Sequence, residues 1–286
     1  MIIGMSGGLG NQMFQYAFGK MLQKKYGGEL YLDTYFYLSH KNRSFVLDQY
    51  KVVYAGKDNY TIYNKMRRYI QRIPLVSTVF GIHKEKKEFQ MDSAVYKYRY
   101  KYYTGYWQNL QYFINDREAL KKDLVYVGDL TEEQIRFANI LESEDSVAVH
   151  VRRSDYKTEK YNTVYYQLGE SYYRNALQYL RDRNGGKQFK IYFFSDDIEW
   201  CKETYKDIDN AEFIDHCISG SQHVDMLLMR KCRYMIMANS TFSWWAAWLS
   251  DRKDSVVIMP ENWYYDKRKN ERVLRALVDD AWIVLK

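Results

Sequence analysis

The sequence predicts an α/β protein built from two Rossmann-like domains that face a cleft. Short β-branched runs alternate with amphipathic helical segments, most regularly from residue 144 onward, and this alternation is typical of a parallel, doubly wound sheet. A separate strand, helix and strand open the chain. With 286 residues the chain is long enough for two cores of ordinary size.

The opening unit is predicted from residues 1–5 (strand), 13–26 (helix) and 30–33 (strand). A glycine-rich loop precedes the helix, whose N-terminal N–H groups can meet an anion or sugar oxygens. Gly8 and Gly10 match a dinucleotide fingerprint, but Met13 stands where its third glycine would be. Asp33 lies near the position of a ribose-binding acid, so a nicotinamide oxidoreductase stays open as an alternative.

Aromatic and basic residues fill the stretch from residue 34 to about 127. Tyrosines and cations alternate strictly over residues 96–102, which predicts a strand. It leads into Gly105-Tyr-Trp-Gln108, a pattern that suits a carbohydrate cleft or ordinary core packing. A carbohydrate-binding protein is therefore a second alternative. Thr131 and Gln134 form a capping box for a helix that ends near Leu141.

After residue 143 the strand and helix rhythm becomes regular, and we place the domain boundary there, giving domains 1–143 and 144–286. Strands are predicted at 146–151, 190–194, 212–214, 234–238 and 255–259, and helices at 172–183, from about 198, at 224–231 and at 242–249.

The whole net charge of +7 lies in residues 1–143, since residues 144–286 hold 22 basic and 22 acidic side chains. Such a basic half can meet nucleic acid, anionic lipid or a phosphate-bearing substrate. No recognition-helix or zinc pattern supports nucleic acid. Residues 65–73 are predicted to form a basic amphipathic helix. This helix could lie on an anionic membrane surface, or it could be a solvated helix that packs on the protein through its apolar stripe.

The cysteines Cys201, Cys217 and Cys232 are odd in number and lack metal-ligand or redox spacing. This pattern fits a reducing cytosol. No signal peptide and no apolar run of about 18 residues is apparent. We therefore expect a cytoplasmic protein, at most peripheral on the inner membrane.

The strand at 146–151 ends in the polar residues His150, Arg152, Arg153 and Asp155. Ligands of open α/β sheets collect at the carboxyl ends of the strands, and two permanently charged guanidinium groups suit a diphosphate. The loops 195–197 and 239–243 should reach the same edge. A surface salt-bridge cluster is the alternative interpretation.

Two acidic pairs in the sequence are candidate metal ligands. Asp207-Ile-Asp209 has an Asp-x-Asp spacing but lies in a polar helix-to-strand connection, whereas Asp196-Asp197 follows a strand without a plausible third ligand. We expect no metal, because the arginine pair can supply preorganised positive charge instead.

Four motifs resemble glycosyltransferase family 11, the α-1,2-fucosyltransferases, in its bacterial branch. They are residues 7–17, 105–108, 150–156 and 239–249, in the expected order. The resemblance implies a GT-B fold, GDP-β-L-fucose as donor, and inverting transfer to a galactose 2-hydroxyl with no cofactor and no metal. It further implies a galactose-terminated oligosaccharide or lipid-linked glycan as acceptor, and a role in surface polysaccharide or oligosaccharide synthesis.

The resemblance also implies residue roles. Arg152 would reach the β-phosphate of the donor, and Arg153 would have a secondary role in donor binding. His150 and Asp225 would recognise the guanine and ribose end. Ser240, Thr241, Phe242 and Ser243 would lie along the diphosphate. The residues themselves, apart from the resemblance, offer two carboxylates close to the motifs as general base, Asp155 and Glu170. Asp155 is equally placed to hold the arginine pair by hydrogen bonds. Asn11 would orient fucose or acceptor. The acceptor side would comprise Gly10, Asn11, Gln12, Tyr106, Trp107 and Gln108.

Overall fold

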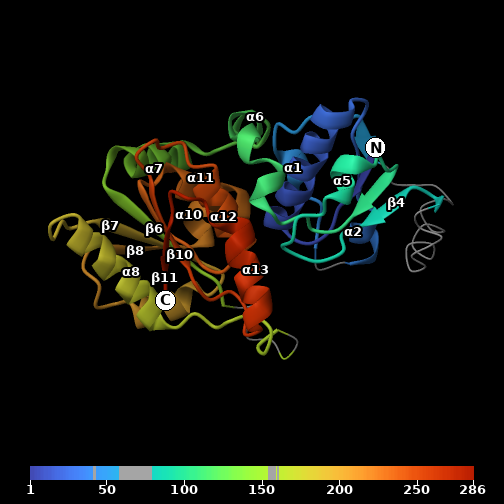
Figure 1. Cartoon of the computed structure of the whole chain (residues 1–286). Helices are drawn as coiled ribbons and strands as arrows, with labels where there is room; N and C mark the ends of the chain where they lie inside the picture. Colours follow the sequence, from blue (N-terminus) through green and yellow to red (C-terminus); the bar gives the residue numbers. More distant parts are fainter. Residues whose placement is uncertain (41–42, 58–78, 154–158, 160) are drawn as a thin grey trace. The chain divides into compact units, whose positions relative to one another are not determined.

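The computed structural model describes residues 1–40, 43–57, 79–153, 159 and 161–286. The chain divides into two compact units (Figure 1). The first comprises Met1–Gly128 with Arg275–Leu277, and the second Asp129–Leu274 with Val278–Lys286. Each unit contains a sheet whose strand pairs are all parallel. This agrees with the predicted α/β class.

The first sheet has the strand order β3-β2-β1-β5-β4. Its strands are β1 (Ile2–Gly4), β2 (Tyr31–Asp33), β3 (Gly56–Lys57), β4 (Ile82–Lys84) and β5 (Tyr102–Thr104). The described helices of this unit are α1 (Leu9–Tyr26), α2 (Tyr35–Ser39), α5 (Ala94–Lys97) and α6 (Arg117–Asp123), with short 3-10 turns at Leu47–Gln49, Leu110–Tyr112 and Ile114–Asp116. The predicted opening strand, helix and strand are therefore present.

Helix α1 begins at Leu9, one turn earlier than predicted, with Gly8 as its N-cap. Large apolar side chains such as Met13, Phe14 and Phe18 are fully buried along it, so packing extends the helix through the glycine-containing motif. It ends at Gly27, whose φ of 66° suits a glycine.

The strand predicted at residues 96–102 is wrong. Residues Ala94–Lys97 form the single helical turn α5, and only Tyr102–Thr104 pair as β5. The Asp92 side chain accepts the N–H of Ala94 at 3.0 Å, and the Tyr26 hydroxyl donates to the Val95 carbonyl at 2.8 Å. These tertiary and local hydrogen bonds stabilise a turn that the alternating pattern does not reveal.

The second sheet has the strand order β11-β10-β9-β6-β7-β8. Its strands are β6 (Ser146–Val151), β7 (Lys190–Ser195), β8 (Ala211–Ile214), β9 (Tyr234–Ile236), β10 (Val256–Pro260) and β11 (Ile283–Leu285). The helices are α7 (Glu132–Ser143), α8 (Glu170–Arg183), α9 (Ile198–Thr204), α10 (His216–Ser219), α11 (Gln222–Lys231), α12 (Thr241–Trp248) and α13 (Lys267–Leu277). The predicted doubly wound rhythm is confirmed, with element ends shifted by a few residues.

Strand β6 is buried on both faces, as a central parallel strand should be. Val147 and Val149 belong to a core that includes Leu177 and Leu180 of α8. Helix α7 meets the neighbouring strand β7 through Phe137, whose ring lies edge-on to Tyr192 at 5.6 Å.

Contacts group α7 with the second unit, where it packs against α11. Gln134 of α7 also donates to the carbonyl of Ser219 at 3.1 Å. The predicted boundary at 143/144 had assigned this helix to the first domain, so the two divisions differ by one helix. The capping box of Thr131 and Gln134 is confirmed.

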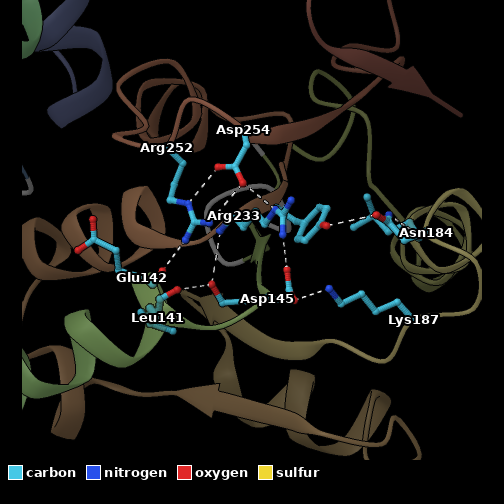
Figure 2. Close-up of polar contacts among 11 residues, drawn as sticks. Leu141, Glu142, Asp145, Asn184, Lys187, Arg233, Arg252 and Asp254 are labelled. Carbon is cyan, nitrogen blue, oxygen red and sulfur yellow. Dashed lines mark hydrogen bonds and ion pairs between the residues drawn. The ribbon is translucent and has the colours of Figure 1, made fainter.

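An ion-pair network lies where β6 and β9 begin, at the amino end of the second sheet (Figure 2). Asp145 pairs with Lys187 and with Arg233, the latter at 2.6 Å. Arg233 also lies 3.0 Å from Asp254, which in turn pairs with Arg252 at 3.2 Å. The network joins segments distant in sequence at the edge opposite the strands' carboxyl ends.

The amphipathic segment at residues 65–73 lies outside the described residues. Within the described part of the chain, no helix combines the length and apolar character that a membrane span requires.

Candidate active site

The carboxyl edge of the second sheet brings the predicted loops together. In the register of β6 and β7, His150 is opposite Phe194 and Val151 is opposite Ser195. Strand β9 pairs with the other side of β6. The segments that follow β6, β7 and β9 therefore leave neighbouring strands at one edge, as predicted.

Asp196 holds both arginines of the strand end. Its Oδ2 lies 3.2 Å from Nη1 of Arg152, and its Oδ1 accepts the backbone N–H of Arg153 at 2.9 Å. The Arg152 side chain keeps 26% of its surface exposed. This pairing fixes a guanidinium at the sheet edge while leaving part of it accessible to a ligand.

Arg153 is directed elsewhere. Its Nε lies 3.3 Å from Oδ2 of Asp197, and its guanidinium carbon lies 3.4 Å from the centre of the Trp200 ring. Stacking and pairing of this kind immobilise an arginine side chain. Consecutive side chains of an extended strand point to opposite sides, and the two arginines have different acidic partners.

His150 is buried at 5% exposure beside the Phe242 ring, 5.5 Å away between ring centres. Burial, with a smaller contribution from Arg152, lowers the pKa of His150 to about 3. The imidazole is therefore neutral at pH 7. Its Nδ1 makes no hydrogen bond to the described residues, and a buried nitrogen of this kind calls for an explanation.

The segment after β9 forms the N-terminus of α12. The Ser240 side chain caps the helix by accepting the N–H of Phe242 at 3.2 Å. Thr241 and Phe242 are partly exposed. Ser243 is fully buried, and its hydroxyl donates to the carbonyls of Ala238 and Ser240. Its side chain is thus turned into the fold rather than along a ligand.

Asn239 also has a structural task that the sequence did not reveal. Its buried amide donates to the carbonyls of Tyr166 at 2.8 Å and Trp263 at 3.1 Å. These bonds connect the α12 loop to two distant segments. The position of the loop at the sheet edge therefore depends on hydrogen bonds of the Asn239 side chain.

Three further predicted residues are Asp225, Asp155 and Glu170. Asp225 lies in the first turn of α11, which packs against α12. Asp155 lies outside the described residues. Glu170, the other candidate base, is paired with Arg174 at the start of α8.

Arginines bind both members of one candidate metal-binding pair and the first member of the other. Asp196 and Asp197 pair with Arg152 and Arg153, whereas Asp207 accepts two bonds from Arg174 at 2.8 and 2.9 Å. Among the described residues no group of three or more His, Cys, Asp or Glu side chains is arranged to hold a metal. The described cysteines Cys201 and Cys232 are buried free thiols.

In the first unit, α1 places its motif residues at the carboxyl end of β1. The Asn11 side-chain oxygen accepts a bond from Nε2 of Gln108 at 2.7 Å. A Cβ at Gly7 would lie 2.4 Å from Nδ2 of Asn11, so glycine is needed there. The structure thus brings two predicted acceptor-side residues together.

Gln12 is a structural residue. Its amide is fully buried, donates to the carbonyls of Gly7 and Ser44, and accepts the N–H groups of Val46 and Leu47. All four of its hydrogen-bonding positions are therefore used by backbone groups. Gly10 is likewise buried within α1.

Trp107 is a core residue, with its ring fully buried and stacked on Phe18 at 4.0 Å. Trp107 therefore cannot stack on an acceptor sugar, whereas the neighbouring Tyr106 is partly exposed.

The backbone N–H of Tyr106 donates to Oε2 of Glu85 at 2.8 Å. Glu85 follows β4 directly, and sequence reasoning missed it because it stands in the charged run 84–88.

Two parallel α/β units, with paired arginines and a helix N-terminus at one strand edge, define a glycosyltransferase of the GT-B class. The chain belongs to glycosyl transferase family 11, whose family model matches residues 2–286. The expected resemblance is thereby confirmed.

Three relatives illustrate the family. The chain is 31% identical to the O-antigen biosynthesis glycosyltransferase WbnK of Escherichia coli, over 98% of this chain and 99% of the relative. It is 31% identical to an alpha-1,2-colitosyltransferase of Escherichia coli, over 93% of each chain. It is 28% identical to galactoside alpha-(1,2)-fucosyltransferase 1 of Homo sapiens, over 51% of this chain and 42% of the relative.

Among solved structures, the fold is similar to that of the NodZ alpha-1,6-fucosyltransferase co-crystallized with GDP. The TM-score is 0.51 at 14% identity, covering 86% of this chain and 90% of that chain. The predicted GT-B fold agrees with this likeness.

Proposed function

We propose that this protein is an inverting α-1,2-fucosyltransferase that moves L-fucose from GDP-β-L-fucose to the 2-hydroxyl of a galactoside. The observation that carries the proposal is the Arg152 guanidinium, held by Asp196 at the carboxyl end of β6. The family, the α-1,2 linkage named for two relatives, and the fucosyltransferase name of one of them support it.

On the donor side, Arg152 binds the β-phosphate of GDP. Negative charge grows on the diphosphate as the bond to fucose C1 breaks, and a fixed guanidinium stabilises that charge. The N-terminus of α12 carries the positive end of the helix dipole, which favours a phosphate group. Ser240, Thr241 and Phe242 belong to this helix start. Arg153, which is held by Asp197 and Trp200, has a secondary role.

No metal is needed in this proposal. Asp196 and Asp197 are charge-paired with arginines, so a divalent cation would have to displace a guanidinium from each. Arg152 takes the place that the cation holds in metal-dependent transferases. GDP-fucose is the substrate and no further cofactor is required.

His150 and Asp225 form the nucleoside end of the donor site in this proposal. Neutral His150 can offer its Nδ1 as a hydrogen-bond donor or acceptor, depending on the tautomer. Asp225 can accept bonds from ribose hydroxyls or from guanine N–H groups. Asp155 is proposed to hold the arginine pair.

On the acceptor side, Asn11, Gln108 and Tyr106 are the proposed contacts, and Gly10, Gln12 and Trp107 support them from within the fold. The residues 1–143 act as the acceptor-side domain and 144–286 as the donor domain. The acceptor is a galactose-terminated oligosaccharide or lipid-linked glycan, used in surface polysaccharide synthesis, as the O-antigen role of one relative suggests.

The decisive experiment incubates the protein with GDP-fucose and a panel of β-galactosides in EDTA, and reads the products by mass and linkage analysis. We expect an α-1,2-fucosylated product. GDP-colitose, which lacks the 3-hydroxyl of GDP-fucose, is run in parallel because of the colitosyltransferase relative. Transfer from that donor alone, a different linkage, or activity that returns only with manganese would contradict the proposal.

Calorimetric titration separates the two other function classes. GDP should bind without added metal. Binding of NAD instead of GDP would favour an oxidoreductase, and binding of galactosides without any turnover would favour a carbohydrate-binding protein.

We also propose that the protein works in the cytoplasm and touches the inner membrane face. The +7 excess of residues 1–143 carries this proposal, since it can attract anionic lipid. Flotation with anionic vesicles at low salt tests it, with neutral vesicles as the control. Absence of binding to the anionic vesicles would refute it.

A further inference from the structure

A carboxyl group lies at the carboxyl edge of the first sheet, directly after β4. The backbone N–H of Glu85 donates to the carbonyl of Thr104 at 2.8 Å, which continues the pairing of β4 with β5. This pairing places Glu85 beside the segment Gly105–Gln108. This strand pairing therefore places the Glu85 side chain at the edge where sheets of this kind bind ligands.

Backbone donors and a close glycine position the carboxyl group. Its Oε2 accepts the Tyr106 N–H at 2.8 Å, and the Trp107 N–H also stabilises its charged form. A Cβ at Gly105 would lie 2.4 Å from Cβ of Glu85, so only glycine permits this approach. The residue keeps partial exposure and can be reached by a substrate.

Two side-chain amides connect this carboxyl group's surroundings to the start of α1. Gln15 donates to the carbonyl of Gly105 at 2.9 Å and accepts the N–H of Ser6. Asn11 accepts from Gln108. Glu85 thus belongs to the same edge of the first sheet as the proposed acceptor contacts.

Other carboxylates near this edge are less suited to accept a proton from a substrate. Asp33 accepts the N–H of Tyr35 at 2.9 Å and the hydroxyl of Tyr102 at 3.0 Å. Asp92 is buried and paired with His83 at 2.8 Å. Asp33 and Asp92 accept their bonds from other parts of the first unit, whereas Glu85 accepts its bonds from the Gly105–Gln108 segment, which carries the proposed acceptor contacts.

We propose that Glu85 is the general base that takes the proton from the acceptor hydroxyl. This inference rests on the proposed function. The acceptor oxygen forms its bond to fucose C1 while the bond from C1 to the diphosphate breaks, the hydroxyl proton passes to the Glu85 carboxylate, and the bonding electron pair leaves with GDP. The base ends as a neutral carboxylic acid and returns its proton to water.

The electrostatic setting of Glu85 agrees with this role. Burial raises the pKa of Glu85 to about 7, although the Tyr106 and Trp107 N–H groups act in the opposite direction. The acidic neighbours Glu88 and Asp92 raise the pKa further, and the Tyr112 hydroxyl is the other titratable group that interacts with it. A base with a pKa close to the working pH is effective in both accepting and releasing a proton.

The test compares the wild type with Glu85→Gln, Glu85→Asp and the matched control Glu88→Gln. Glutamine keeps an oxygen that can accept the Tyr106 N–H but removes the basicity. With GDP-fucose and a β-galactoside, we expect Glu85→Gln to lose about 10²–10⁴-fold in kcat, Glu85→Asp to lose less, and Glu88→Gln to stay within a few-fold of wild type.

Azide separates a catalytic from a structural role, because it attacks C1 without any proton to lose. We expect Glu85→Gln to form fucosyl azide at a rate close to that of wild type. Equal losses with azide and with the galactoside would overturn the inference in favour of a structural role. Unchanged galactoside transfer by Glu85→Gln would overturn it as well.

The pH profile of the wild type gives a second test that requires no variant. We expect kcat to fall below an apparent pKa near 7, and for this fall to be absent from the azide reaction. A galactoside profile that stays level down to pH 5 would refute the inference. A wild type without any transfer from GDP-fucose would instead overturn the proposed function, and with it this assignment.

Discussion

Asp196 and Arg152 are linked across two neighbouring strand ends, with Oδ2 of the aspartate 3.2 Å from Nη1 of the arginine. The aspartate follows β7 and the arginine follows β6. The same carboxylate accepts the backbone N–H of Arg153 at 2.9 Å, while Asp197 holds the Arg153 guanidinium. An adjacent Asp-Asp pair, which resembles a metal-ligand motif in the sequence, here positions cations of the protein itself.

Replacing Arg152 should reduce turnover strongly. Arg152→Ala removes a fixed charge next to the leaving diphosphate, which should cost about 3 kcal/mol of transition-state stabilisation, or 10²–10³-fold in kcat. Arg152→Lys should recover only part of this, because it lacks the bidentate fork. Initial rates with GDP-fucose measure the effect, with the exposed Arg183→Ala as control. Near-normal turnover by Arg152→Ala would remove this residue from the site.

Replacing Asp196 should act through the arginine. Asp196→Asn removes the negative partner of Arg152 while it keeps the shape, and loss of a hydrogen bond to a charged group costs about 1.5–3 kcal/mol. We expect a roughly tenfold to hundredfold weaker affinity for GDP, measured by calorimetry. Asp207→Asn, which removes one of the two carboxylate partners of Arg174 instead, should leave GDP binding as in wild type. If both variants bind GDP normally, Asp196 does not orient the motif.

Asn11 should be needed for transfer but not for donor binding. Asn11→Ala removes the partner of Gln108, and we expect at least a tenfold loss of transferase activity, about 1.4 kcal/mol, with unchanged affinity for GDP. Rates and calorimetry on the same preparation separate the two effects. Asn139→Ala on the exposed side of α7 is the control. Full activity of Asn11→Ala would exclude it from the site.

His150 should make stability depend on pH. Its folded-state pKa of about 3 lies below the unfolded value of about 6.5, so the unfolded chain binds the extra proton. The stabilising contribution is complete above pH 6.5 and is lost as the pH falls from there toward 3. We expect the free energy of unfolding to drop about 2 kcal/mol more in wild type than in His150→Asn between pH 7 and pH 5. Denaturant unfolding measures it, and parallel curves for the two proteins would contradict a neutral buried imidazole.

The network in Figure 2 should contribute to stability and not to catalysis. Asp145 connects Arg233 and Lys187, and these partners lower its pKa. We expect Asp145→Ala to reduce the free energy of unfolding at neutral pH by about 1 kcal/mol, with kcat unchanged. Glu203→Ala, which breaks an exposed pair with Lys206, should leave stability as it is. A change in kcat without a change in stability would contradict this assignment.

Much of the second unit could be predicted from the sequence, because each parallel strand there is a compact apolar run that ends in polar residues. The same regularity located His150, Arg152 and the start of α12. In the first unit the strands are short, and the alternating tyrosines at 96–102 suggested a strand where Asp92 and Tyr26 stabilise a helical turn. A local sequence pattern does not predict the secondary structure where tertiary hydrogen bonds determine the backbone conformation.

The sequence by itself determined the class of fold, the family, and the strand end that bears the arginines, since these depend on residue order and periodicity along one element. Tertiary structure alone decided which motif residues are buried and which are exposed. Gln12 and Trp107 carry motif positions but are buried among their own backbone and ring partners. Glu85 looks like one more charge in an exposed run, and only the pairing of β4 with β5 places it beside Tyr106. Such contacts join residues far apart in the chain, and no periodicity within a segment encodes them.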